Sequence, residues 1–152
     1  MTDLERILKY LKEGSVGKID LRNALLIGVD LRGANLKGAD LGGAVLSDAN
    51  LSESDLSNAN LSYADLTCAN LENANLQNAN LNNVELNCAI LKGANLRYAN
   101  LKSANLCETN LTCADLRGAN LKEAYLDEAI LLNVYLSGAD LRSSQGKKWL
   151  RK

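Results

Sequence analysis

The sequence predicts a tandem-repeat protein, and three observations support this prediction. Every fifth position from Leu21 to Leu141 is leucine, which gives 25 leucines at 25 positions. Alanine stands two residues before 19 of these leucines, and asparagine or aspartate stands directly before 18 of them. No residue is inserted or deleted between Ile19 and Ser143. Self-similarity at a fixed period is the signature of a repeat architecture.

A period of five fits neither of the common secondary structures. A helix gathers like residues on one face at a period of 3.6, and a strand does so at a period of 2. In a straight strand, leucines five residues apart would point alternately to opposite faces. In a helix they would rotate steadily around the axis. Neither arrangement gives the leucines a common core.

The A-(D/N)-L-x-x pattern resembles that of the pentapeptide repeat family, over about four-fifths of the chain. The resemblance implies an all-β solenoid, the right-handed quadrilateral β-helix of the Rfr-fold. In that fold four pentapeptides make one square coil, so 25 repeats would make about six coils, and residues four repeats apart would stack. The resemblance also implies that each leucine, and the small residue two places before it, point inward. Proteins of this family are especially abundant in cyanobacteria.

Polar residues recur at a spacing that suits such a coil. Arg22, Lys102, Lys122 and Arg142 all directly follow a leucine and are separated by multiples of four repeats. Asparagines recur in the same way directly before leucine, at Asn60, Asn80, Asn100 and Asn120. Stacked asparagine side chains can hydrogen-bond to one another, whereas stacked aspartates repel. We therefore expect an asparagine ladder along one side of the rod.

The segment 1–18 precedes the repeats and predicts a cap. Thr2 and Glu5 have the spacing of a capping box. Leu4, Ile7, Leu8 and Leu11 then follow at helical spacing, and Gly14 offers a stop. We expect a helix over residues 3–13 that covers the first coil. The alternative is a helix lying on a membrane surface, which its short length and mixed charges disfavour.

The C-terminal end departs from the repeat pattern and carries a basic tail, residues 144–152. Apolar residues occupy positions of the last coil that should face outward, and the tail adds two more. This C-terminal patch comprises Tyr125, Ile130, Leu132, Tyr135, Trp149 and Leu150. One interpretation is that the tail folds back and covers the last coil. The other is a homodimer interface, because exposed aromatic and aliphatic patches mark partner sites, and the resemblance includes relatives that dimerise through their C-termini.

Charge is distributed unevenly over the four predicted faces, although the net charge is only −1. The face built around Leu26 and the leucines that follow it at intervals of four repeats carries no lysine or arginine. Its six acidic residues are Asp48, Asp65, Glu85, Glu108, Asp127 and Glu128. We name this surface the acidic face and predict that it binds a basic protein partner, with the interaction steered by charge. The alternative is that the uneven charge arose by chance and that these carboxylates are simply solvated surface groups.

Two of the four cysteines, Cys68 and Cys88, are four repeats apart and should stack on the acidic face. They are a candidate redox pair, although parallel Cβ atoms one coil apart are slightly too distant for an unstrained disulfide. The alternative is four free thiols, as expected in a cytosolic protein. A metal site is not expected, because the chain has no histidine and its cysteines spread over more than one face.

The sequence predicts a protein that is not an enzyme, with no catalytic residue and no cofactor. Without histidine there is no imidazole base, and no glycine-rich phosphate loop occurs. No run of apolar residues is long enough to span a membrane, so the chain is expected in the cytoplasm. Its basic residues are dispersed, which argues against direct nucleic-acid binding.

Two functions remain as hypotheses. The first is a non-catalytic structural or scaffold module that presents flat solenoid faces to a protein partner. The second comes from the resemblance, since some pentapeptide repeat proteins imitate the charge of DNA, bind DNA gyrase and protect it from quinolones. The single acidic face suits this second role, whereas the near-neutral net charge, the basic tail and the absence of an interrupting loop depart from it.

Overall fold

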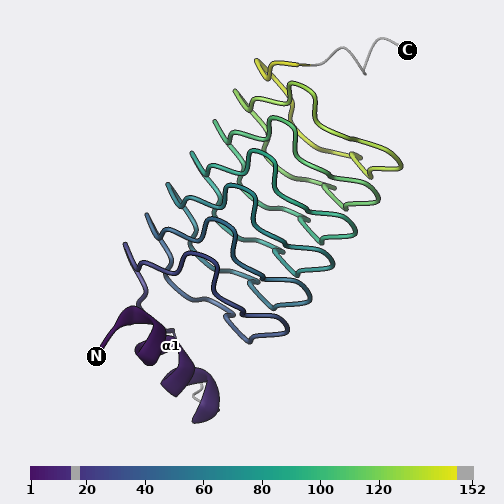
Figure 1. Ribbon diagram of the computed structural model, residues 1–152. Coiled ribbons are helices and arrows are strands. Elements are labelled where there is room, and N and C mark those ends of the chain that lie inside the picture. Colours follow the sequence, from purple (N-terminus) through teal and green to yellow (C-terminus); the bar gives the residue numbers. More distant parts are fainter. Residues whose placement is uncertain (15–17, 147–152) are drawn as a thin grey trace.

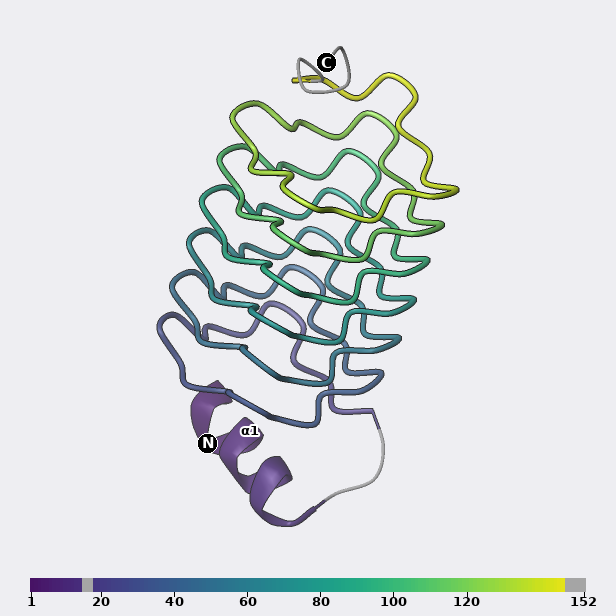
Figure 2. The same ribbon diagram turned by 90° about the vertical axis from the view of Figure 1, so that its right-hand side faces the viewer.

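The computed structural model describes residues 1–14 and 18–146. The chain forms one short helix, α1 (Asp3–Lys12), followed by a rod of stacked coils (Figure 1). α1 lies at the N-terminal end of the rod, and the described chain ends at the opposite end (Figure 2). No helix in these two ranges is long and apolar enough to cross a membrane.

Each pentapeptide changes the direction of the chain through one tight turn. In the first repeat the Ala24 amide donates to the Leu21 carbonyl oxygen over 3.0 Å, which closes a four-residue β-turn. The third residue of this turn, Asn23, has a φ of 55°, and 17 further non-glycine residues in the described part of the chain also have positive φ. This conformation costs a non-glycine residue about 1–2 kcal/mol. Where Glu53 or Tyr63 adopts it, the stacked coil rather than local preference holds the turn.

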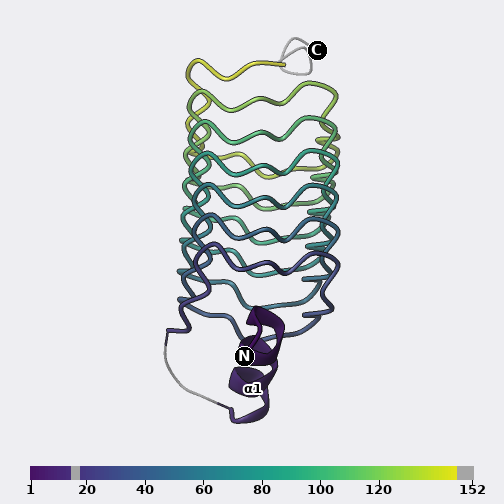
Figure 3. The same ribbon diagram turned by 60° about the vertical axis from the view of Figure 1, so that its left-hand side comes forward.

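Successive coils are joined by parallel bridges between residues four repeats apart. These bridges run from Asp20↔Asp40 at one end to Tyr125↔Gln145 at the other. Between two coils, the Leu41 amide donates to the Asn60 carbonyl oxygen over 2.7 Å, and the Asn60 amide donates to that of Ala39 over 2.9 Å. The coils are therefore in register along the whole rod (Figure 3), and the predicted four-repeat register is confirmed.

The core is a stack of leucines with alanines between them. Each repeat leucine from Leu21 to Leu126 is at most 2% exposed, and the alanines two positions earlier are buried beside them. Leu131, Leu136 and Leu141, in the last coil, are only partly buried. The inward direction of the leucines is confirmed, and the core is less completely buried toward its C-terminal end.

The predicted asparagine ladder is present and ends on a carboxylate. The side-chain Nδ2 of Asn120 donates to Oδ1 of Asn100 over 2.9 Å, and Asn100 donates to Asn80 over 3.1 Å. Asn80 donates to Asn60 over 3.2 Å, and Asn60 donates to Oδ1 of Asp40 over 2.8 Å. Every bond runs in the same direction, so each amide inside the ladder is both donor and acceptor. A second ladder of this kind runs through Asn95, Asn75 and Asp55.

Helix α1 begins with the predicted capping box. The Glu5 amide donates to the Thr2 hydroxyl over 3.1 Å, and the Thr2 amide donates to the Glu5 carboxylate over 2.7 Å. Ile7 is fully buried against the first coil, and Leu11 is half-buried. Leu4 and Leu8 remain 44% and 49% exposed, so only part of the apolar stripe of α1 covers the first coil.

The reason lies in how α1 meets the first coil. In the second coil, the Val45 amide donates to the Ala24 carbonyl oxygen below it over 2.9 Å. The equivalent amide of the first coil belongs to Leu25 and has no coil below it, and the Asp3 carboxylate accepts its hydrogen bond over 3.1 Å. Arg6 also donates to the Asp20 carbonyl oxygen over 2.6 Å. These polar anchors turn the face of Asp3, Arg6 and Ile7 toward the rod.

Two of the turn glycines differ in the space around them, and the effect of this difference on stability can be tested. Gly118 and Gly28 both have positive φ, but a Cβ added at Gly118 would lie 2.6 Å from the Tyr98 ring, while at Gly28 it would meet nothing within 4 Å. We expect Gly118→Ala to lower the free energy of unfolding by more than Gly28→Ala, which carries only the backbone cost of about 1–2 kcal/mol. Urea unfolding of both variants measures the difference. Equal losses would mean that the Tyr98 ring moves aside freely.

Candidate functional site

The acidic face is a continuous strip along the rod. Asp65 and Glu85 form a parallel bridge directly above one another. Asp48, Glu108 and Glu128 all occupy the third position of a turn, with φ between 58° and 59°. Asp127 precedes Glu128 in the last turn of the strip. Five of the six side chains are exposed, and Asp65 is half-buried.

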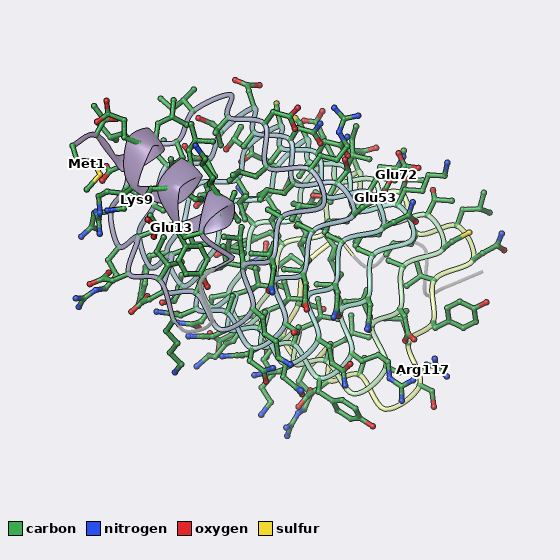
Figure 4. The ribbon with its side chains drawn as sticks, turned by 90° about the horizontal axis from the view of Figure 1, so that it is seen from below. Met1, Lys9, Glu13, Glu53, Glu72 and Arg117 are labelled. Carbon is green, nitrogen blue, oxygen red and sulfur yellow. The ribbon has the colours of Figure 1, made fainter. Side chains whose placement is uncertain are left out.

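None of these six carboxylates forms an ion pair with a described residue, whereas the other three faces neutralise most of their own charge. Those faces carry nine acidic residues, and all but Glu53 and Asp55 are paired with a lysine or arginine of the same face. Glu53 and Glu72 lie near each other on one side of the rod, and Arg117 projects from a different side (Figure 4). The negative charge of the acidic face is therefore left available to an external cation or partner.

The hydrogen bonds of the acidic face come from uncharged groups. The Thr67 amide donates to Oδ1 of Asp65 over 2.9 Å, within the turn that follows it. The side-chain amide of Asn105 donates to the Glu85 carboxylate over 2.7 Å from the next coil. These bonds fix the direction of two carboxylates without cancelling their charge.

The ion pairs of the other faces shift the pKa values of their aspartates. Hydrogen bonds from the Arg22 side chain and amide hold the pKa of Asp20 at about 2. Asp140 is paired with Arg142 and Lys122 over 2.7 and 3.4 Å, and mainly the Arg142 hydrogen bond holds its pKa well below the ordinary range. Arg22 also lies 3.7 Å from Asp40, so it relieves the repulsion of the stacked Asp20 and Asp40.

These low pKa values predict a pH dependence. Because the pKa of Asp20 is lower in the folded chain than its ordinary value of about 3.9, its pair with Arg22 stabilises the fold above that value. The contribution is lost as the pH falls toward about 2. We expect Arg22→Ala to be destabilising at neutral pH, with a difference from the wild type that shrinks between about pH 4 and 2. Urea unfolding at a series of pH values measures it, and a difference independent of pH would contradict the assignment.

The structure brings two of the four cysteines together. Cys68 and Cys88 occupy the same turn position in neighbouring coils of the acidic face, with φ of 57° and 60°. Both are free and exposed. Cys107 lies on the same face in the second position of its turn, and Cys113 lies on the neighbouring face. The stacking of Cys68 and Cys88 follows the four-repeat register, and their role as a redox pair stays a prediction.

The outward apolar residues of the last coil are exposed. Tyr125, Ile130, Leu132 and Tyr135 are 42%, 49%, 62% and 57% exposed. Trp149 and Leu150, the other two predicted members of the C-terminal patch, lie outside the described residues. One coil earlier, the Leu116 amide donates to the Tyr135 carbonyl oxygen. The equivalent amide of the last coil, that of Leu136, makes no such hydrogen bond to a described residue.

Two arginine–tyrosine contacts were not predicted. The Arg97 guanidinium lies 5.8 Å from the centre of the Tyr98 ring, and that of Arg117 lies 5.6 Å from the centre of the Tyr135 ring. Such contacts stabilise a cation over an aromatic face. The first contact could have been suspected, because Arg97 and Tyr98 are adjacent in the sequence. The second joins neighbouring coils and becomes visible only when the sequence is written in rows of four repeats.

The described surface offers little for small-molecule chemistry. No group of three or more acidic or cysteine side chains converges there in a way that could hold a metal ion. A depression of about 280 Å³ is lined by Lys122, Glu123, Arg142 and Ser143. Lys122 and Arg142 are already paired with Asp140, and Glu123 lies 3.8 Å from Lys102.

Comparison with known families settles the class of the protein. The sequence profile of pentapeptide repeats matches in eight copies that together extend over residues 11–145. The chain belongs to the pentapeptide repeat family. The family and its solved structures imply the right-handed sense of the β-helix. No curated protein sequence matches the chain.

Several solved pentapeptide repeat proteins are similar to this one. The protein alr5209 from Nostoc PCC 7120 is 27% identical with a TM-score of 0.52, over 92% of this chain and 96% of that one. Rfr23 from the cyanobacterium Cyanothece 51142 is 28% identical with a TM-score of 0.45, over 93% and 97%. QnrB1, a plasmid-mediated fluoroquinolone resistance protein, is 22% identical with a TM-score of 0.53, over 84% and 69%. This last similarity concerns the fold alone.

Proposed function

We propose that this pentapeptide repeat protein is a non-catalytic interaction module whose acidic face binds a basic surface of a partner protein. The observation that carries the proposal is the absence of any ion pair at Asp48, Asp65, Glu85, Glu108, Asp127 and Glu128 among the described residues. The other three faces, made by the same repeats, pair most of their acidic residues. A strip of one sign attracts a partner of the opposite sign and speeds its association.

The rod suits this role because its side chains are held at fixed spacing. Glu85 stands one coil above Asp65, and Glu108 and Glu128 stand one coil apart in a neighbouring column. Parallel strands are about 4.8 Å apart, so the carboxylates form a regular array on a rigid backbone. Lysines or arginines of a partner can meet several of them without reordering the rod.

The test compares two triple variants with equal charge change. Asp48→Asn, Glu108→Gln and Glu128→Gln remove three charges from the acidic face, and Glu53→Gln, Asp55→Asn and Glu72→Gln remove three from other faces. The probe is a lysine-rich peptide titrated by calorimetry at low and high ionic strength. We expect binding that weakens with salt and is lost only in the first variant. Equal weakening in both variants would mean that net charge alone attracts the peptide.

Gyrase modulation remains the alternative function. The acidic face is the feature that favours it, because a DNA mimic presents a row of negative charges to its target. A supercoiling assay with DNA gyrase tests it directly. Inhibition, or protection from a quinolone, that disappears in the acidic-face variant would support this alternative, and no effect at a large excess of protein would remove it.

We also propose that a second copy of the chain covers the C-terminal patch. The exposed Tyr125, Ile130, Leu132 and Tyr135 and the half-buried last coil support this, and a fold-back of the tail is the competing arrangement. Light scattering on the full chain, on Leu132→Glu and on a chain ending at Ser143 distinguishes them. A dimer that dissociates in Leu132→Glu supports the proposal. A full-length monomer contradicts it.

A further inference from the structure

Cys68 and Cys88 present a pair of thiols with a defined spacing. The Cys68 amide donates to the Asn87 carbonyl oxygen, and the Cys88 amide donates to that of Cys107, each over 3.0 Å. The two residues thus make the same bond to the coil above and have nearly the same φ. Their Cα–Cβ bonds are therefore close to parallel, and the Cβ atoms lie about one coil spacing apart, roughly 4.8 Å.

This spacing is long for a disulfide but suits a bridging ion. Disulfide-bonded cysteines have Cβ atoms about 3.5–4.5 Å apart and sulfurs about 2.05 Å apart. Two metal–sulfur bonds of about 2.3 Å, the length of a zinc–thiolate bond, would separate the sulfurs by about 4.6 Å if they lay end to end. Parallel side chains one coil apart reach this separation with little rotation. A disulfide would instead require the two neighbouring coils to move closer together, so that the Cβ atoms come within its range.

We propose that Cys68 and Cys88 form a two-coordinate site for a soft monovalent cation of the Cu(I) class, with one sulfur of each neighbouring coil as ligand. Soft thiolate ligands select Cu(I), zinc and iron–sulfur clusters. Zinc would require further ligands, since its sites are four-coordinate. No third acidic or cysteine side chain of the described residues converges on the pair.

The surroundings of the pair favour a cation. Asp48 and Glu108 occupy the same turn position in the coils below and above the thiols, and neither is ion-paired with a described residue. Their negative charge attracts a metal ion to the two thiols. Because a thiol binds a metal ion as its thiolate, the ion must displace the thiol protons, and its affinity should rise with pH.

Anaerobic titration of the reduced chain with Cu(I), against a coloured Cu(I) chelator, tests the proposal. We expect one ion per chain, an apparent affinity that increases with pH, and little competition from Zn²⁺. Cys68→Ser and Cys88→Ser should each lose the ion. Serine suits this turn position, because Ser103 and Ser143 adopt it with φ of 56° and 59°, so both variants should fold.

The neighbouring face supplies matched controls. Cys113 has the same turn conformation, with φ of 59°, but stacks between Gly93 and Asn133 and has no thiol beside it. Cys113→Ser should leave Cu(I) binding unchanged, whereas Asn133→Cys should create a second stacked pair and a second bound ion.

Three results would overturn the proposal: no transfer of Cu(I) from the chelator, binding that survives Cys68→Ser, or ready formation of a Cys68–Cys88 disulfide in air. The last would show that the sulfurs meet directly. None of these variants alters a carboxylate of the acidic face, so the outcome is independent of the proposed protein interaction.

Discussion

Leu81→Ala is expected to lower the free energy of unfolding by about 2–5 kcal/mol, the range found when a buried leucine is truncated and a cavity remains. Leu81 is 1% exposed and stands in the middle of the leucine stack. The backbone above and below it is fixed by coil-to-coil hydrogen bonds, such as that from the Leu81 amide to the Asn100 carbonyl oxygen over 2.8 Å. The coils cannot collapse around the cavity without breaking these bonds, so we expect a loss toward the upper part of the range.

Leu131→Ala is the matched control. It makes the same change at the same position of a repeat, but in the last coil, where the leucine is only partly buried. Less contact is lost there and water can enter, so the loss should be smaller. Urea unfolding followed by circular dichroism measures both. Equal losses would mean that the C-terminal coil is covered in solution as completely as the centre.

Ile7→Asp should have the second large effect, with a loss of about 3 kcal/mol or more. Ile7 is fully buried between α1 and the first coil, and the change removes its apolar contacts and leaves a carboxylate there without a cationic partner. We expect α1 to detach. The first coil would then lose the bonds that Asp3 and Arg6 supply, and a solenoid that exposes its terminal core becomes prone to association.

Leu8→Asp on the same helix is the control, because Leu8 is 49% exposed. It should leave both stability and solution mass nearly unchanged. Thermal unfolding and light scattering on the two variants check this. A stable, monomeric Ile7→Asp protein would show that the rod does not need its helix as a cap.

The sequence predicted the interior of the rod well, because a strict repeat leaves little freedom there. The resemblance to the pentapeptide repeat family supplied the four-repeat register, and this register places Asn60 beneath Asn80 and Cys68 beneath Cys88. The same reasoning predicted which carboxylates share the acidic face. The pattern is periodic, so an error at one repeat would have appeared at all of them.

The ends and the long side chains could not be predicted in this way. The orientation of α1 depends on Asp3 and Arg6 reaching backbone groups of the first coil, and the apolar spacing of Leu4 and Leu8 gave no sign of this. The contact of Arg117 with Tyr135 depends on rotamers that bring two coils together. No described lysine or arginine pairs with the acidic face, and this depends on the reach of side chains from other faces, which the count of charges on each face did not establish.

The four-repeat register also limits how the length of this protein can change. Insertion of a single pentapeptide after Asn80 would keep every leucine inside, but it would rotate all later repeats by one face. Cys88 would no longer stand above Cys68, Asn100 would leave its ladder, and the acidic face would be split between two sides. Insertion or deletion of a whole coil preserves every column. Gene segments that encode whole coils are therefore the units in which such a rod can lengthen or shorten while it retains its surfaces.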